Sequence, residues 1–180
     1  MNAANGSAGG RFWEPRYVLA GLQAGVIGCF WIFACVMTGA LLGGRSIWVV
    51  PNLFATTFFG SGVYRDHFLR ASLAGTALIV AIYGGLGVVW GCIWRDESRP
   101  RLTLYGALFG IVVYYALFHF VWRRANGLIV LYAPVRTIAL AHVLWGMILA
   151  KSPKYARRIG DFSRKPAGQE EAVRSGEAIT

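Results

Sequence analysis

The chain has 180 residues, of which 56% are apolar and only 14% are charged, with a formal net charge of +10. Ordinary soluble proteins contain roughly 25% charged residues, so this composition argues against a soluble helical protein. The positive charges flank apolar runs and crowd the C-terminal segment, as topology signals and contacts with anionic lipids do, which argues against nucleic-acid binding. The length suits one membrane domain without a separate soluble domain.

The first apolar run covers residues 17–42 and contains no Asp, Glu, Lys or Arg. About 20 apolar residues suffice to cross a hydrocarbon core of roughly 30 Å, and the run is longer than the roughly 7–15 apolar residues of a signal peptide. We therefore predict a retained transmembrane helix. The preceding residues 1–16 are expected to form a disordered tail.

We do not expect the uncharged segment 46–64 to form a fifth span, because Pro51, Asn52 and several other polar residues and glycines interrupt it. A short interfacial helix that starts at Pro51, a favoured first helical position, and ends at Gly60 fits better. Trp48, Phe54, Phe58 and Phe59 would then anchor this helix in the outer interface.

Two further charge-poor runs predict transmembrane helices at about 69–94 and 102–122, joined by the charged turn 95–101. Small residues recur along the first three spans. In lipid, close backbone approach supplies much of the attraction between helices, so we expect these glycines to mediate packing within one bundle, although the same faces could dimerise. The predicted packing positions are Gly21, Gly25, Gly28, Gly84, Gly87, Gly91, Gly106 and Gly110.

The fourth run, 128–150, is interrupted only by Arg136, and its start is open to two interpretations. Pro134 either opens the helix or kinks a helix that runs from Leu128. In the first case Arg136 lies at the interface; in the second its long side chain snorkels to the headgroups. Arg136 is also a candidate for binding an anion or a lipid headgroup.

The C-terminal segment 151–180 begins with basic residues and continues with polar ones. Such a polybasic stretch beside a membrane suits an anionic inner leaflet. We expect four residues to contact anionic lipid, namely Lys151, Lys154, Arg157 and Arg158. The end of the segment is expected to be disordered.

The distribution of Lys and Arg predicts that both termini are cytoplasmic. With that orientation 12 of these residues lie in inner segments and 6 in outer ones, as the positive-inside rule requires. The predicted location is the inner (plasma) membrane, with the chain crossing it several times.

Two histidines fall within predicted spans, so haem or metal binding has to be considered. At about 1.5 Å per helical residue, His119 and His142 differ by roughly 14 Å in height, too far apart to share one iron. An outer site of Asp66, His67 and His119 is conceivable, but hydrogen-bonded packing histidines are the simpler interpretation. We expect no metal or other cofactor.

Catalytic signals are absent from the sequence. No predicted span contains Asp or Glu, which cation-coupled transport usually needs within the membrane. No hydrolase elbow, zinc-protease, P-loop or CxxC motif occurs. Cys29, Cys35 and Cys92 all lie in apolar runs at spacings that match no zinc or redox motif. We therefore predict a protein that is not an enzyme.

A faint internal repeat relates the two halves of the chain. Residues 88–93, VVWGCI, parallel residues 143–148, VLWGMI. Two helical hairpins that each begin and end on the cytoplasmic side of the membrane would have the same orientation. The similarity therefore suggests a parallel duplication about the membrane normal, with residues 43–64 inserted in the first half.

Two short motifs carry a resemblance to known proteins. The glycine-rich first span is followed by Arg45-Ser46-Ile47-Trp48 and Pro51-Asn52, and the last span contains AHVLWG at 141–146. In these features residues 17–150 resemble an uncharacterised type of small four-span bacterial inner-membrane protein. The resemblance implies an architecture and a bacterial membrane, and no activity.

The sequence thus predicts an all-α polytopic membrane protein: a four-helix bundle with a short interfacial helix between the first two spans. Three functions remain open. The first is a non-enzymatic bundle that contacts membrane lipids and associates with itself or with a larger membrane complex. The second is a small transporter or pore, and the third is a membrane anchor that binds haem or quinone through one histidine.

Overall fold

Four of the helices formed by the described residues are long and apolar enough to cross a membrane, which confirms the predicted fold class. The computed structural model describes residues 14–65, 67–95 and 101–163. Of residues 162 and 163 it describes the backbone alone. Within these ranges no strand occurs. The elements are α1 (Pro15–Leu42), α2 (Val49–Phe59), the 3₁₀ turn η2 (Ser61–Val63), α3 (Arg70–Ile93), α4 (Leu102–Tyr115), the π-helical segment η3 (Ala116–Trp122), α5 (Arg123–Ala125), α6 (Gly127–Tyr132), α7 (Val135–Leu149) and α8 (Ser152–Ser163).

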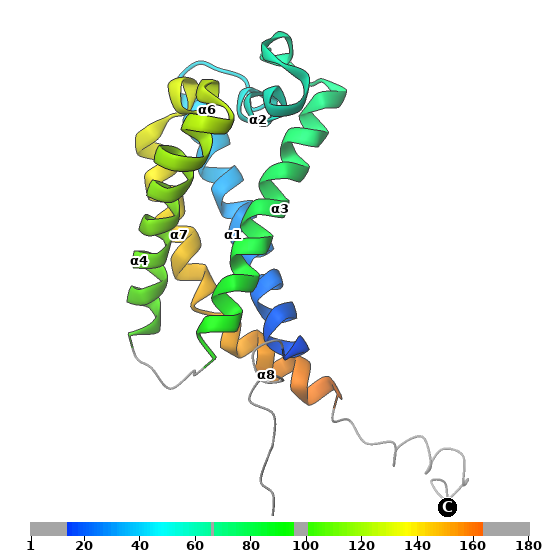
Figure 1. The fold of residues 1–180 in the computed structure, drawn as a ribbon, viewed down its shortest axis with the longest axis vertical. Coiled ribbons are helices and arrows are strands. Elements are labelled where there is room, and N and C mark those ends of the chain that lie inside the picture. Colours follow the sequence, from blue (N-terminus) through cyan, green and yellow to red (C-terminus); the bar gives the residue numbers. More distant parts are fainter. Residues whose placement is uncertain (1–13, 66, 96–100, 164–180) are drawn as a thin grey trace, which may run out of the picture.

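The long helices lie side by side in the order α3, α1, α7 and α4 (Figure 1). The helix α1 packs against both α3 and α7, whereas α4 packs mainly against α7. The elements α2, η2 and α6 cover one end of the bundle, which we call the α2 end. The start of α1 and the helix α8 pack together at the opposite end, the α8 end (Figure 1).

Local sequence explains where the elements at the α2 end begin and end. The helix α2 stops before Gly60, whose φ of 74° is favourable only for glycine. It begins at Val49, two residues before the predicted start. The side chain of Asn126 accepts a hydrogen bond from the backbone N–H of Leu128 and so caps α6. Pro134 immediately precedes α7.

The helices α1 and α3 form a hairpin whose backbones touch along a line of glycines. A Cβ atom at Gly91 would lie 2.5 Å from the carbonyl oxygen of Tyr17, and one at Gly21 would overlap the carbonyl of Gly87. At Gly25 a Cβ would lie 2.5 Å from the carbonyl of Tyr83. Only glycine permits this approach, and Gly21 and Gly25 of α1 contact the glycines of α3, whereas Gly28 lies against Trp145 of α7.

The helices α4 and α7 form a second hairpin with the same kind of contact. A Cβ at Gly146 would overlap the carbonyl of Gly106, and one at Gly110 would overlap the carbonyl of His142. The residues of α7 correspond to those of α3 at the offset of 55 that relates the two sequence repeats: Gly146 matches Gly91, and His142 matches Gly87. The internal repeat is therefore also a repeat of packing.

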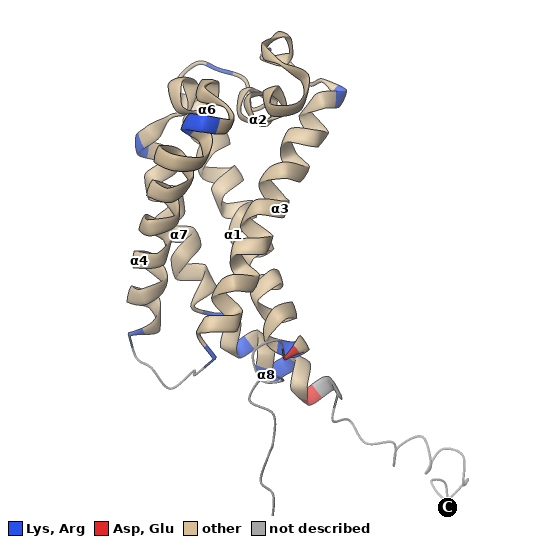
Figure 2. Ribbon diagram, in the orientation of Figure 1, with Lys and Arg blue, Asp and Glu red and all other residues tan. Residues whose placement is uncertain are grey.

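The outward faces of the long helices carry large apolar side chains. Leu42 is 85% exposed, Phe30 68% and Phe120 67%, although all three belong to long apolar segments. A surface this apolar on all sides suits contact with lipid rather than water. Lys and Arg gather at the two ends of the bundle and are absent from the middle (Figure 2).

The fourth long helix differs from the predicted span 128–150. Of the two alternatives for its start, the structure has the helix opening after Pro134, with α6 as a separate short helix. At its other end, α7 is followed closely by α8, which packs against α1 and buries Ser152 and Ala156. The sequence did not predict α8. Of the tail 1–16 that was expected to be disordered, Pro15 and Arg16 are helical and begin α1, and residues 1–13 lie outside the described residues, as do residues 164–180 at the other end.

Candidate functional site

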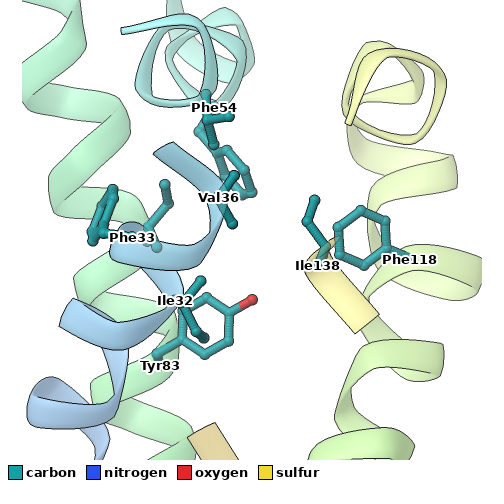
Figure 3. A pocket seen from close by; sticks show the side chains of 9 residues that line it. Ile32, Phe33, Val36, Phe54, Tyr83, Phe118 and Ile138 are labelled. Atoms are coloured by element: carbon teal, nitrogen blue, oxygen red, sulfur yellow. The ribbon is translucent and has the colours of Figure 1, made fainter. Parts of the chain in front are cut away.

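An apolar cavity separates the two hairpins beneath α2. The space in it that a water-sized sphere can occupy is about 20 Å³, and its surface is almost entirely apolar. Figure 3 shows Ile32, Val36 and Tyr83 on one side of the cavity and Phe118 and Ile138 facing them from the other. The walls thus come from α1 and α3 on one side and from η3 and α7 on the other. The remaining lining residues are Phe33, Val50, Phe54 and Ile79.

A buried hydrogen bond between Tyr83 and His142 borders this cavity. The Tyr83 oxygen lies 2.8 Å from Nε2 of His142, and Nδ1 of the same ring lies 2.7 Å from the carbonyl oxygen of Ile138. A carbonyl can only accept, so Nδ1 carries the proton in the neutral ring, and the Tyr83 hydroxyl donates to Nε2. Both ring nitrogens of His142 are therefore in use.

The phenolic oxygen of Tyr83 is the polar atom that this arrangement offers to the cavity. Its proton is directed to His142, so towards a ligand the oxygen can act only as an acceptor. In Figure 3 the Tyr83 oxygen points into the gap between the two sides of the cavity. The site therefore suits an apolar molecule that carries at most one hydrogen-bond donor at this position.

Aromatic rings surround the Tyr83–His142 pair. The ring of His142 lies 5.4 Å from the ring of Tyr114 and 6.1 Å from that of Phe118, centroid to centroid. Tyr83 lies 5.3 Å from Trp145, whose Nε1 donates across the hairpins to the carbonyl of Gly25 at 3.3 Å. These contacts fix the two hairpins relative to each other below the cavity.

The π-helical segment η3 supplies Phe118 to the cavity wall. Long π-helical segments are rare, and π-bulges within α-helices are frequent at functional sites. The segment η3 also contributes Trp122, whose ring packs at 5.2 Å against Phe54 of α2. The π-helical segment η3 therefore contacts both the cavity, through Phe118, and the helix α2 that covers it, through Trp122.

The helix α2 covers the cavity and is held there by two asparagines. The Nδ2 atom of Asn52 donates to the carbonyls of Arg65 at 2.7 Å and His67 at 2.9 Å, and its Oδ1 accepts from the hydroxyl of Ser72. On the other side, Asn126 Nδ2 donates to the hydroxyl of Thr56 at 2.7 Å. These bonds connect α2 to the start of α3 and to α6.

The aromatic residues of α2 divide between the two faces of the helix. Phe58 and Phe59 are exposed, as an interfacial anchor requires, and Trp48 packs against Phe68. The prediction for Phe54 was wrong, because its side chain is buried and lines the cavity. A helix that covers a bundle has an inner face, which the sequence of α2 does not reveal.

The other predicted ligand residues lie apart from the cavity. Arg136 is exposed in the first turn of α7 at the α2 end. His119 is exposed on the outside of η3, where it stacks on Tyr115. His142 alone lies beside the cavity. Of the conceivable outer metal site, Asp66 is outside the described residues, and His67 is exposed; no group of three or more potential metal ligands occurs among the residues described.

The basic residues predicted to contact anionic lipid lie at the α8 end. Lys151, Lys154, Arg157 and Arg158 are all exposed there. Arg157 additionally lines a second cavity, which it shares with Arg16 and Arg95.

Sequence reasoning missed Tyr83, although a signal for it exists. Tyr83 lies four residues before Gly87 and eight before Gly91, and therefore on the packing face that these glycines define. His142 has the same relation to Gly146. A polar aromatic side chain one turn from a packing glycine is thus a candidate for a contact between hairpins.

Comparison with known proteins does not add to these observations. No family model, no curated protein and no solved structure matches the chain.

Proposed function

We propose that this protein is a non-enzymatic, multi-pass membrane protein that binds a hydrophobic molecule between its two hairpins. The supporting observation is the cavity between the hairpins, which has almost entirely apolar walls and the Tyr83 oxygen at its edge. Ligand sites in proteins typically combine apolar walls with few polar groups. Because the space between the side chains is only about 20 Å³ in this structure, binding of a chain requires the two hairpins to move apart. An acyl or isoprenoid chain, with or without a terminal hydroxyl, has the matching chemistry.

The proposed orientation has the α8 end in the cytoplasm and the cavity in the outer half of an inner (plasma) membrane. The excess of Lys and Arg in the segments on the α8 side supports this orientation. The cavity lies under α2, so a ligand would enter from the outer leaflet.

Identification of molecules that co-purify with the full chain tests the proposal. The chain is purified from its membranes in a mild detergent, then denatured and extracted with organic solvent for mass spectrometry. We expect one hydrophobic species near equimolar amount in the unmodified protein. Val36→Trp should fill the cavity and remove this species, whereas Val112→Trp, on a lipid-exposed face of α4, should retain it.

Overpacking costs about 1–3 kcal/mol, so each variant is first checked for a monodisperse size-exclusion peak. Phe118→Ala provides a second test if Val36→Trp does not fold, because it enlarges the cavity and should change the chain length of the retained species. Identical extracts from all four proteins would overturn the proposal.

The matched packing of the two hairpins favours a small transporter as a second candidate. Internal repeats of this kind occur in many transporters, with the substrate bound between the repeats. Arg136 does not contribute to this argument because it lies exposed at the α2 end, away from the cavity. Ligand uptake into proteoliposomes that is lost in Val36→Trp and retained in Arg136→Ala would support transport; equal uptake by protein-free liposomes would exclude it.

The proposed association with other copies or with a larger complex rested on the glycine faces. The predicted packing glycines of α1, α3 and α4 contact backbone or side chains within the same chain, so they do not provide a free dimerisation surface. Crosslinking in native membranes tests the association directly. Monomers alone, without a partner, would count against it.

His142 is the remaining candidate for a haem or quinone anchor. Coordination of iron through Nε2 would require loss of the hydrogen bond from Tyr83, since Nδ1 already donates to Ile138. An absorption spectrum of the same preparation tests this alternative. A Soret band that disappears in His142→Ala would favour haem over the hydrophobic ligand proposed here.

A further inference from the structure

The two hairpins pack together along one edge of the bundle and stand apart along the other. The repeat that relates them pairs α1 with α4 and α3 with α7, so a symmetric bundle would pack α3 against α4 as it packs α7 against α1. In the structure α1 and α7 pack closely, whereas the backbones of α3 and α4 barely approach each other along their described residues (Figure 1). We call the side between α3 and α4, with its continuation between α3 and η3, the open edge.

The glycine contacts establish the correspondence between α1 and α4. A Cβ atom at Gly21 of α1 would overlap the carbonyl of Gly87 in α3. In the second hairpin, a Cβ atom at Gly110 of α4 would overlap the carbonyl of His142 in α7. Since His142 matches Gly87 in the repeat, Gly110 matches Gly21, and the neighbouring residues of α1 and α4 correspond in the same way.

The helix α4 has an aromatic residue at a position where α1 has a small one. The residue before Gly21 is Ala20, which is buried and carries only a methyl group, whereas its counterpart in α4 is Phe109. The ring of Phe109 lies 5.2 Å from that of Trp90 and 6.2 Å from that of Trp94, centroid to centroid. Trp90 belongs to α3 and Trp94 directly follows it. These rings fill the space between the two backbones, and the bulk of Phe109 keeps α4 from packing directly on α3.

Two tryptophans that correspond in the repeat differ in their hydrogen bonding. Trp145 of α7 donates through Nε1 to the carbonyl of Gly25 in α1 at 3.3 Å. Its counterpart in α3 is Trp90, and the acceptor that corresponds to Gly25 is the carbonyl of Tyr114 in α4. Trp90 is completely buried, yet its Nε1 has no hydrogen-bond partner among the described residues. Buried donors in native structures normally have an acceptor, so the unpaired N–H indicates an interface that is kept from closing.

The open edge adjoins the apolar cavity between the hairpins. The helices α1 and α7 pack together on one side of this cavity, α2 covers it, and the bond between Tyr83 and His142 borders it below. On the remaining side, Ile79 of α3 and Phe118 of η3 line the cavity from opposite sides of the open edge. In that direction no helix of the described part of the chain stands between the cavity and the surrounding lipid.

From these observations we propose that the open edge admits an acyl chain of the surrounding bilayer to the cavity, and that Phe109 is the wedge that keeps this edge open. The inference rests on the proposed function, to which it adds the source of the hydrophobic molecule and its route. The cavity walls are almost entirely apolar, as a hydrocarbon chain requires. The hairpins can part further along the open edge without loss of the packing between α1 and α7.

Photolabelling from within the bilayer tests the route. The full-length chain is reconstituted into phosphatidylcholine vesicles that contain phosphatidylcholine with a diazirine in one acyl chain, then illuminated and mapped by mass spectrometry. We expect labels on the buried cavity residues Ile79 and Phe118 as well as on the lipid-exposed faces. Phe109→Ala should reduce the labelling of both cavity residues several-fold. The control Val112→Ala, on a lipid-exposed face of α4, should leave it unchanged.

Distances between spin labels test the wedge independently of any bound molecule. The labels are attached at Val89→Cys in α3 and Leu108→Cys in α4, two lipid-exposed positions, in a background without the native cysteines. Phe109→Ala should shorten the distance between them, and Phe109→Trp should lengthen it. A pair at Phe30→Cys and Leu140→Cys, on the exposed faces of α1 and α7, should keep its distance in both variants. Should Phe109→Ala not fold, Phe109→Leu replaces it.

The outcomes separate the route from the site itself. A retained hydrophobic species together with unlabelled cavity residues would leave the proposed site in place and overturn the side entrance. The same distance between the α3 and α4 labels in all Phe109 variants would overturn the wedge. Undiminished labelling of the cavity in Phe109→Ala, at a shortened distance, would overturn the connection between wedge and entrance.

Discussion

The hydroxyl of Tyr83 donates to Nε2 of His142 across 2.8 Å, and this bond connects α3 of one hairpin to α7 of the other. The helices α3 and α7 make few other contacts with each other, since α1 lies between them along most of their length. His142 is completely buried, and Tyr83 nearly so. This polar contact and the bond from Trp145 Nε1 to the carbonyl of Gly25 thus link the two halves of the bundle below the cavity.

Tyr83→Phe should destabilise the protein by about 1 kcal/mol, because it leaves Nε2 of His142 buried without its donor. The measurement is the unfolding of purified protein in mixed micelles of increasing SDS content. The matched control is Tyr115→Phe on the lipid-exposed face of α4, which should unfold at the same SDS fraction as the unmodified protein. Equal behaviour of the two variants would show that the bond does not stabilise the bundle.

Gly146→Ala should be strongly destabilising, by about 1–3 kcal/mol, because the added Cβ overlaps the carbonyl of Gly106 and forces α4 and α7 apart. Gly85→Ala is the control, since a Cβ there meets no atom within 4 Å. The melting temperatures of Gly146→Ala and Gly85→Ala in detergent, followed by size exclusion, are compared. A melting temperature for Gly146→Ala equal to that of Gly85→Ala would contradict the close packing described here.

Asn52→Ala should loosen the cover of the cavity. It removes the donors to the carbonyls of Arg65 and His67 and leaves the Ser72 hydroxyl without its acceptor. Hydrogen–deuterium exchange should therefore accelerate over residues 61–69 and α2, while α4 remains unchanged. Ser61→Ala, an exposed site in the same region, should show the exchange of the unmodified protein. Unchanged exchange in Asn52→Ala would mean that packing alone holds α2.

The proposed orientation predicts which end of the bundle reacts with an impermeant maleimide on intact cells. In a background that lacks Cys29, Cys35 and Cys92, Ser61→Cys at the α2 end should be labelled from outside. Lys154→Cys on α8 should be labelled only after the membrane is permeabilised. The opposite pattern would reverse the proposed orientation.

Much of the fold was predictable because transmembrane helices have a strong sequence signal. Charge-free runs of sufficient length predicted the first three long helices, and the spacing of Gly21, Gly25 and Gly28 predicted a packing face. The structure divides that face between two neighbours, since Gly21 and Gly25 contact α3 while Gly28 lies against Trp145 of α7. A periodic pattern identifies a face and not the helix that will cover it.

The site was harder to predict because it depends on contacts between distant segments. Tyr83 and His142 are 59 residues apart, and nothing local indicates that their helices place them at the same height. The π-helical geometry of η3 and the fold of α8 onto α1 likewise have no clear signal in composition. The sequence predicted Arg16 and Arg95 only as topology signals and Arg157 as a contact to anionic lipid, because the cavity that the three line forms only when α8 is in place.

The matched glycine contacts have a consequence for how the protein is assembled. Each hairpin is closed by backbone contacts made entirely within itself, so α1 with α3, and α4 with α7, can form as separate units as the ribosome delivers them to the membrane. The bonds from Trp145 to Gly25 and from Tyr83 to His142 can form only afterwards. The cavity between the hairpins is therefore a product of the last step, and two fragments divided within residues 96–100 should reassemble it when co-expressed.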